Sequence, residues 1–178
     1  MRASSTFVVG LLISQNGCAV DTPPGLGDKV VDSSLEVVAT GGTARGIGTE
    51  FKLSELAGKP VILDFWASWC GPCRLQHQYV ADLKARYGDR IEIVGVLTRD
   101  LPENARVWLQ REGSTYPTVL EDKDALVDEF WVSGLPRFVL LDPEGRLSWD
   151  FMGAATEANP WTTDSVEVRI EQMLHTSH

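Results

Sequence analysis

Two cysteines stand three positions apart in the segment Trp69-Cys70-Gly71-Pro72-Cys73. A Cys-x-x-Cys pair at the start of a helix that follows a buried strand places its first sulfur near the unpaired N–H groups and the positive end of that helix. Such surroundings lower a thiol pKa from about 8.5 to between about 3.5 and 7.5. We therefore expect Cys70 to attack disulfides near neutral pH and Cys73 to resolve the mixed disulfide that results.

Two other interpretations of the cysteine pair are a zinc site and a purely structural disulfide. Zinc needs about four ligands, but the chain has one further cysteine, Cys18, and three histidines, His77, His175 and His178, two of them at the C-terminal end. A structural bridge over so short a loop would constrain little of the unfolded chain's entropy. The pattern favours redox chemistry with neither a metal nor another cofactor.

Asp64 is the candidate proton carrier for this chemistry. It stands near the end of the apolar run Pro60–Phe65, which is typical of a buried strand. A carboxyl group buried there is desolvated, so its pKa should rise and it could exchange a proton with Cys73. The alternative is a structural aspartate that binds nearby backbone groups. His77, one helical turn after Cys73, could tune that cysteine, although we expect this histidine on the helix surface.

Length and composition suit one globular domain with some extra N-terminal length. The chain has 178 residues, of which 43% are hydrophobic, and a net charge of −9. Lysines and arginines form no cluster that could neutralise a run of phosphates, so nucleic acid is not an expected partner. No apolar run approaches the roughly 20 residues that a membrane span needs.

Residues 1–19 have the order of a weak export signal. Arg2 precedes the apolar run Phe7–Ile13, and small residues follow around Cys18. We expect export and hence a periplasmic or other extracytoplasmic location. A lipoprotein leader, in which Cys18 would tether the protein to a membrane, is a less favoured option. The alternative is an ordinary N-terminal extension on a cytoplasmic protein.

The rest of the chain divides near residue 48. Residues 20–48 are rich in Pro, Gly, Thr and Ser and indicate a linker with one peripheral strand, whereas residues 49–178 indicate the folded domain. The predicted strands and extended segments are Leu35–Val38, Pro60–Phe65, Ile91–Leu97, Tyr116–Leu120, and a hairpin of Arg137–Leu141 and Arg146–Phe151. The predicted helical segments are a turn at Leu53–Gly58 and helices at Cys70–Tyr87, Lys123–Trp131 and Ser165–Leu174, the last capped by Asp164 and Glu167. A further helix is expected to be capped by Asp100, with Val107 and Trp108 facing inward.

This order of elements predicts the fold class. Strands that alternate with helices imply parallel pairing and right-handed crossovers, whereas the hairpin implies antiparallel pairing. We therefore expect an α/β protein with a mixed central sheet and helices on both of its faces.

Several segments resemble a known family. The segment Val61–Arg74 resembles the thioredoxin active-site segment nearly residue for residue. Leu53–Pro60 and Gly134–Asp142 are similar to the TlpA/ResA-like branch of the thioredoxin-like proteins, and Cys73–Tyr79 to their CcmG/DsbE-type members, which act in cytochrome c maturation. The resemblance covers about residues 53–151 and implies a thioredoxin-like fold.

The resemblance also implies roles for residues around the cysteines. Asp64 matches a buried carboxylate beneath the pair, and Leu135-Pro136 matches a cis-proline segment that presents the backbone of Leu135 to an extended substrate. Trp66 is expected to pack in the core. The expected catalytic residues are Cys70, Cys73 and Asp64, and the expected substrate-binding residues are Trp69, Gly71, Pro72, Leu135 and Pro136.

Three residues depart from the family pattern. Gln76 stands where many TlpA-like proteins have Glu, and Gln78 replaces a helix-kinking Pro. Arg137 follows the expected cis-proline, where cytochrome-maturation members tend to have an acidic residue. A cation there would reverse the charge beside the cleft, so the preference for a cytochrome c apoprotein does not carry over.

The function that these features predict is thiol–disulfide oxidoreduction: reducing or exchanging the disulfides of exported proteins, with cytochrome c maturation as one such role. The expected partners are protein disulfide or dithiol substrates and an upstream electron donor. The direction of electron flow is open, since only analogy with thioredoxin, near about −270 mV, suggests a reducing couple. The alternatives are a thioredoxin-fold peroxidase and a redox-inert binding or chaperone module.

Overall fold

A mixed β-sheet forms the centre of the fold. The structure is a computed structural model that describes residues 23–40, 45–121, 124–154 and 160–176, with side chains in the last range described from residue 166 onward. Its described strands form one seven-stranded sheet in the order β2-β1-β5-β4-β3-β6-β7. The strands are β1 Ser34–Ala39, β2 Glu50–Lys52, β3 Val61–Trp66, β4 Glu92–Leu97, β5 Thr118–Glu121, β6 Arg137–Leu141 and β7 Leu147–Met152.

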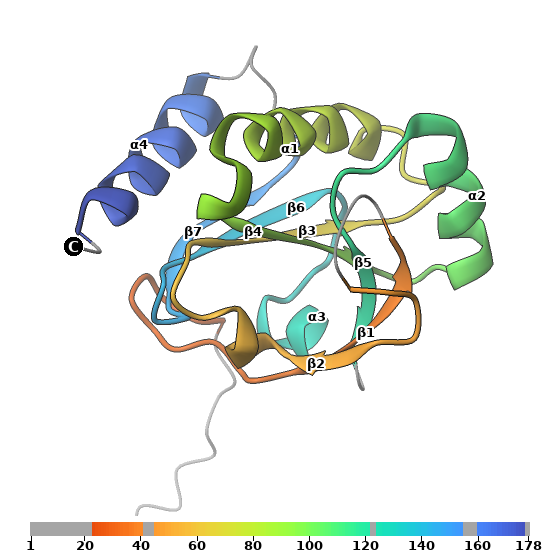
Figure 1. Cartoon of the computed structure of the whole chain (residues 1–178), viewed down its shortest axis with the longest axis horizontal. Coiled ribbons are helices and arrows are strands. Elements are labelled where there is room, and N and C mark those ends of the chain that lie inside the picture. The colour runs from red at the N-terminus through yellow and green to blue at the C-terminus, as the bar shows by residue number, and fades with distance from the viewer. Residues whose placement is uncertain (1–22, 41–44, 122–123, 155–159, 177–178) are drawn as a thin grey trace, which may run out of the picture.

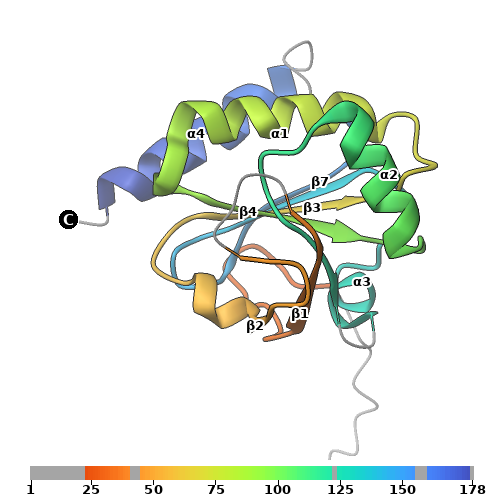
Figure 2. The same ribbon diagram turned by 45° about the vertical axis from the view of Figure 1, so that its right-hand side comes forward.

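Helices cover both faces of this sheet. They are the α-helices α1 Cys73–Tyr87, α2 Pro102–Glu112, α3 Ala125–Glu129 and α4 Pro160–Thr176, and the short 3-10 helices η1 Leu53–Leu56 and η2 Gly88–Arg90. Helices α1 and α4 lie on one face and α3 on the other (Figures 1 and 2). The pairs β3–β4 and β4–β5 are parallel, while the other strand pairs are antiparallel. The predicted α/β class with a mixed sheet is therefore confirmed.

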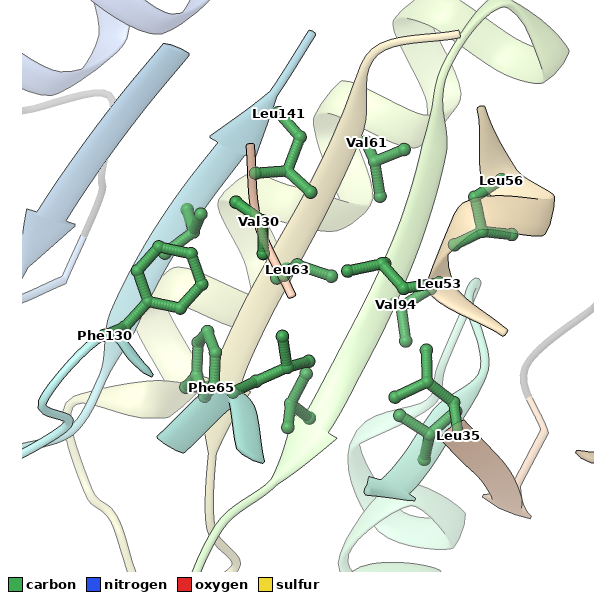
Figure 3. Packing of buried hydrophobic residues seen from close by; sticks show 14 of the residues in the cluster. Val30, Leu35, Leu53, Leu56, Val61, Leu63, Phe65, Val94, Phe130 and Leu141 are labelled. Atoms are coloured by element: carbon green, nitrogen blue, oxygen red, sulfur yellow. The ribbon is translucent and has the colours of Figure 1, made fainter. Parts of the chain in front are cut away.

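Strand β3 divides its side chains between the two faces because successive residues of a strand point in opposite directions. Leu63 and Phe65 belong to the apolar cluster on the α3 face, where Phe65 meets the ring of Phe130 edge-on at 6.0 Å (Figure 3). Ile62 belongs to the cluster beneath α1 and α4. Burial of each such side chain stabilises the fold by about 1.5 to 3 kcal/mol, so β3 holds the two layers together.

Most predicted elements are present, with shifted ends. Helix α1 begins at Cys73 and not at Cys70, because the residues between the cysteines form the turn that enters the helix. Helix α4 begins at Pro160, a residue suited to the first helical turn. The predicted cap at Asp164 is therefore wrong, since that residue lies inside the helix. The predicted hairpin is confirmed as β6 and β7, with Gly145 at a φ of 74° in its turn.

The second helix also differs from expectation. Leu101, not Asp100, is the N-cap residue of α2. Trp108 is buried as predicted, but Val107 is exposed, because the buried stripe of α2 consists of Ala105, Trp108 and Leu109. The prediction that Val107 faces inward is therefore wrong, while that for Trp108 is confirmed.

The regions outside the predicted domain core are described in part. The strand expected at the periphery is β1, which pairs with β2 on one side and β5 on the other. Residues 1–19, including Cys18, and Lys123 lie outside the described residues. Within the described ranges no helix has the length and apolar character to cross a membrane. The proposed division of the chain at residue 48 stays a prediction.

Candidate functional site

The two cysteines of the Cys-x-x-Cys segment form a disulfide between the end of β3 and the start of α1. Their Cα atoms are 5.4 Å apart, and the N–H of Cys73 donates to the carbonyl of Cys70 at 3.2 Å. Cys70 is 5% exposed and Cys73 is 1% exposed. The pair thus bridges the turn that enters α1, with Cys73 at the first residue of the helix, and Cys70 is the more exposed residue of the two.

Asp100 holds the loop that leads to the cysteines. One of its carboxylate oxygens accepts the N–H of Ser68 at 2.7 Å, and the other accepts the N–H of Leu101 at 2.8 Å. Burial would raise the pKa of Asp100, but these hydrogen bonds outweigh it and the pKa is lowered. The residue predicted as a helix cap therefore fixes the position of the active-site loop against the start of α2.

The two tryptophans before the pair lie in different surroundings. Trp69 is 62% exposed, and its indole N–H donates to the carbonyl of Arg99 at 3.2 Å. Trp66 is buried, with its ring centroid 4.9 Å from that of Trp108. The structure thus places Trp69 at the rim of the site and Trp66 in the core beneath it.

The peptide bond between Leu135 and Pro136 is cis, as the family resemblance implies. These residues directly precede β6, which pairs with β3, so that Arg137 lies opposite Phe65 close to the end of β3 that leads to the cysteines. Leu135 packs against the apolar cluster that contains both cysteines. The cis-proline segment therefore lies beside the disulfide.

Asp64 is buried on the α1 face of β3. One carboxylate oxygen accepts a short hydrogen bond from the amide of Gln76, and the other accepts the hydroxyl of Tyr116 at 2.8 Å. Burial raises the pKa of Asp64, although the hydrogen bonds from Gln76 and Tyr116 and the charge of His77 oppose the rise. The direction agrees with the expectation from sequence, while the partners are side chains and not the backbone groups of the structural alternative.

His77 is buried, and the expectation of a surface histidine is wrong. It is 7% exposed, its Nδ1 lies 2.6 Å from the hydroxyl of Tyr116, and its Nε2 lies 2.9 Å from the carbonyl of Gly113. The helical pattern held a signal for this, because Gln76 and His77 stand three and four residues after Cys73. Those positions share a helix face, whereas the neighbouring Leu75 is exposed.

Gly95 makes room for this network. It lies opposite Asp64 on the parallel strand β4. A Cβ atom at Gly95 would lie 2.9 Å from Nε1 of Trp66, 3.0 Å from the hydroxyl of Thr118 and 3.3 Å from the ring of Tyr116. Glycine therefore allows the Tyr116 ring to reach the buried carboxylate, a role that sequence reasoning missed together with those of Tyr116 and Gln76.

Arg137 does not add an unbalanced charge to the cleft, which corrects the expectation from sequence. Its guanidinium group binds both carboxylate oxygens of Asp150 on β7, with Nε donating at 2.7 Å. Its carbonyl accepts the second hydrogen bond from the Gln76 amide at 3.3 Å. The β6–β7 pairing thus neutralises Arg137 within the sheet.

Among the described ranges no three His, Cys, Asp or Glu side chains are grouped so that they could hold a metal ion. The chemistry that the arrangement can support is thiol–disulfide exchange at the cysteine pair, with a buried carboxylate to move protons.

Comparisons with known proteins agree with this geometry. The sequence profile of the Redoxin family matches residues 26–167. The chain is 32% identical over 112 residues to the thiol-disulfide oxidoreductase ResA of Bacillus subtilis (strain 168), and 35% identical over 118 residues to the thiol:disulfide interchange protein HelX of Rhodobacter capsulatus. These matches cover 62% and 66% of this chain, and 63% and 62% of the two relatives, which is less than two thirds of either.

A solved structure is similar over nearly its whole length. It is a protein from Chlorobium tepidum assigned as a thiol:disulfide interchange protein DsbE, with a TM-score of 0.70 and 27% sequence identity. The match covers 85% of this chain and 99% of that one. The similarity confirms the thioredoxin-like fold that the active-site segment implied.

Proposed function

This chain belongs to the Redoxin family, and from that premise we propose that it is a thiol–disulfide oxidoreductase that works through Cys70 and Cys73. The observation that carries the proposal is the disulfide between these residues at the first turn of α1, beside the cis Leu135–Pro136 bond. The activities for which the relatives ResA and HelX are named support the same chemistry.

The greater exposure of Cys70 supports its assignment as the attacking thiol. In the reduced protein the Cys70 thiolate attacks a substrate disulfide, forms a mixed disulfide and releases one substrate thiolate. The Cys73 thiolate then attacks the Cys70 sulfur, which forms the Cys70–Cys73 disulfide and releases the second substrate thiolate. Two electrons pass to the substrate, and a dithiol donor must return two electrons to the pair for the next turnover.

Asp64 takes the proton that Cys73 must lose before it attacks. Its burial on β3 and its hydrogen bond to Gln76, one helical turn after Cys73, support this assignment. Because burial raises the pKa of Asp64, the carboxylate is a stronger base than an exposed aspartate.

The substrate lies across the rim of the site in this proposal. Trp69, Gly71 and Pro72 are exposed beside the disulfide, and Leu135 is partly exposed before the cis-proline. The backbone of Leu135 would bind an extended substrate segment as an added strand, with Pro136 fixing its direction. This mode selects an unfolded or extended protein disulfide over a compact one.

We further propose that the clients are exported proteins, with cytochrome c apoproteins among them, since the ion pair of Arg137 with Asp150 removes the charge reversal that was expected beside the cleft. The export pattern of residues 1–19 supports an extracytoplasmic site of action, with a membrane tether through Cys18 as an additional element. Fractionation of cells that express the full chain tests the location. Recovery of the protein in the cytoplasm alone would contradict it.

Reduction of insulin disulfides tests the activity. We expect the reduced protein to accelerate the reaction and the Cys70→Ser variant to lose that acceleration. Val107→Ala is the matched control, because Val107 is an exposed residue of α2 outside the site. Unchanged activity in Cys70→Ser would refute the proposal, and rapid peroxide consumption by Cys70 without insulin reduction would favour a peroxidase.

A further inference from the structure

Four groups form a continuous hydrogen-bonded chain from Asp64 to the end of α2. The chain runs from the Asp64 carboxylate to the Tyr116 hydroxyl at 2.8 Å, from that hydroxyl to Nδ1 of His77 at 2.6 Å, and from Nε2 of His77 to the carbonyl of Gly113 at 2.9 Å. Asp64 comes from β3, His77 from α1, and Tyr116 from the loop between α2 and β5. Three separate elements thus contribute to one buried polar path.

The fixed ends of this path determine where protons can lie. The carbonyl of Gly113 can only accept, so Nε2 of His77 must carry a hydrogen. At the other end, the two amide hydrogens of Gln76 point to Asp64 and to the carbonyl of Arg137, so Asp64 accepts there. The remaining freedom is the position of one proton between Asp64 and Nδ1 of His77.

Two arrangements satisfy every donor and acceptor. In the first, Asp64 is ionised, Tyr116 donates to it, and the imidazolium form of His77 donates from Nδ1 to the Tyr116 oxygen. In the second, Asp64 is protonated and donates to Tyr116, which donates to Nδ1 of a neutral His77. Both arrangements hold the same number of protons, and they interconvert when each bridging proton moves along its own hydrogen bond.

We propose that Tyr116 and His77 are a proton relay for Asp64, sharing one proton with it across the Tyr116 hydroxyl and carrying the proton of Cys73 away from the disulfide site. The inference rests on the proposed oxidoreductase function and adds two positioning residues to it. His77 is the outer end of the relay, and Tyr116 is the bridge.

The surroundings suit both arrangements. Gly113 caps the C-terminus of α2, so the carbonyl that accepts the Nε2 hydrogen of His77 lies at the end of that helix. Burial and the neighbouring Asp64 raise the pKa of Tyr116 well above its ordinary value, so its hydroxyl stays neutral while it passes protons. Burial of Asp64 favours the second arrangement, in which no charge is buried.

Several charged groups on the neighbouring elements are engaged in ion pairs, and Arg106 of α2 donates to the carbonyl of Val38. Arg137 of β6 binds Asp150 of β7. Arg74 of α1 binds Glu112 at the end of α2 at 2.8 Å, with Arg111 3.9 Å from the same carboxylate. In the reduced protein the Cys73 thiol is a further titratable group, at the first residue of α1. The proton shared by Asp64 and His77 responds to that thiol in this proposal.

The relay completes the proton balance of the resolving step. The Cys73 thiol gives its proton to ionised Asp64, and the resulting thiolate attacks Cys70. Tyr116 then receives hydrogen bonds from both sides, and its own hydrogen has no acceptor. Loss of a proton from His77 to solvent, to which this residue is 7% exposed, restores a fully satisfied network, so uptake at Asp64 drives release at His77.

Nuclear magnetic resonance of the oxidised protein tests the shared proton without any substrate. We expect the Asp64 carboxyl carbon and the His77 ring nitrogens to shift with a common midpoint where the network gains or loses a proton as pH changes, because both groups share that proton. In Asp64→Asn the amide can donate to Tyr116 as the protonated acid does, so the response of the His77 ring nitrogens to pH should differ from that in the wild type. A His77 titration that is identical in the two proteins would overturn the relay.

The rate at which the mixed disulfide is resolved tests whether the relay takes part in the reaction. Tyr116→Phe removes a hydrogen bond to the ionised carboxylate, so the pH at which resolution becomes fast should rise by about one unit. His77→Gln should shift the midpoint in the same direction, because the positive partner of Asp64 is lost. Tyr87→Phe, which removes a buried hydroxyl at the far end of α1, is the matched control and should leave the midpoint unchanged.

The outcomes separate the relay from the proposed function. Unshifted midpoints in Tyr116→Phe and His77→Gln would overturn the relay even if insulin is reduced. A common midpoint in a protein that cannot reduce insulin would support the shared proton and overturn the oxidoreductase function. Should Tyr116→Phe fail to fold, the comparison of the wild type with Asp64→Asn by nuclear magnetic resonance still tests the relay.

Discussion

The two faces of the central sheet use the same strand for different purposes. On the α3 face β3 presents Val61, Leu63 and Phe65 to an apolar cluster (Figure 3). On the α1 face the same strand presents Asp64 between Ile62 and Trp66. One face thus supplies apolar burial, which stabilises the fold, and the other holds a buried carboxyl group, which destabilises it when ionised.

This difference between the two faces explains how a small fold can hold a buried polar site. Asp64, Gln76, His77 and Tyr116 are buried like the side chains of the apolar core, and each has a hydrogen-bond partner. A rigid apolar layer on the opposite face allows this, because β3 is held in place without help from the polar network. Changes on the two faces should therefore have opposite signatures in stability and activity.

The largest effect is expected from Phe65→Ala on the apolar face. Removal of a buried ring that packs against Phe130 leaves a cavity and should lower the free energy of unfolding by about 3 to 5 kcal/mol. The pH dependence of insulin reduction by the folded fraction should not change. Urea unfolding and activity measured side by side test this, and an altered pH dependence would show that the faces are coupled.

Asp64→Asn should have the opposite signature. Loss of the proton acceptor should slow insulin reduction at pH 7 by about a hundredfold, while the protein becomes more stable. The folded pKa of Asp64 is raised above its ordinary value of 3.8, so its contribution to stability is complete below that value and is lost as pH rises through the folded pKa.

The stability curves of the wild type and Asp64→Asn should therefore diverge as pH rises. Urea unfolding at several pH values measures the divergence. A variant that is less stable than the wild type at neutral pH would contradict the account of the α1 face.

Gly95→Ala probes the space beside Asp64. The added methyl group would meet Trp66, Thr118 and Tyr116 at 3.3 Å or less, and overpacking of this kind should cost about 1 to 3 kcal/mol. Gly46→Ala is the matched control, because an added Cβ there meets nothing within 4 Å. Equal stability of the two variants would mean that the Tyr116 ring is not closely held.

The smallest effect is expected from Glu121→Gln on the α3 side. Burial raises the pKa of Glu121 to about 7, against the hydrogen bonds it accepts from the N–H groups of Leu126 and Val127. Its contribution to stability is complete below the ordinary value of 4.5 and is lost as pH rises through about 7.

Glutamine keeps an acceptor for α3 and cannot ionise, so Glu121→Gln should remove this pH dependence. Because Glu121 is partly exposed, we expect a change of about 1 kcal/mol. Parallel stability curves for the wild type and Glu121→Gln from pH 5 to 8 would show that the carboxyl group titrates below this range.

Local patterns predicted the parts of the fold that depend on local sequence. Apolar runs predicted the buried strands, and the Cys-x-x-Cys spacing predicted the reactive pair. Tyr116 and Gly95 could not be placed in this way, because the hydrogen bond of Tyr116 to Asp64 joins residues 52 positions apart. Arg137 was misjudged because its partner Asp150 depends on the register of the β6–β7 hairpin.

Trapping of a mixed disulfide tests the central claim most directly. Reduced Cys73→Ser, with Cys18→Ser added to remove the third thiol, is mixed with a disulfide-bonded protein substrate and analysed by mass spectrometry. We predict a stable adduct through Cys70 and none in the corresponding Cys70→Ser protein, whose remaining Cys73 is 1% exposed. An equal yield of adduct through Cys73, or no adduct in either protein, would contradict the account.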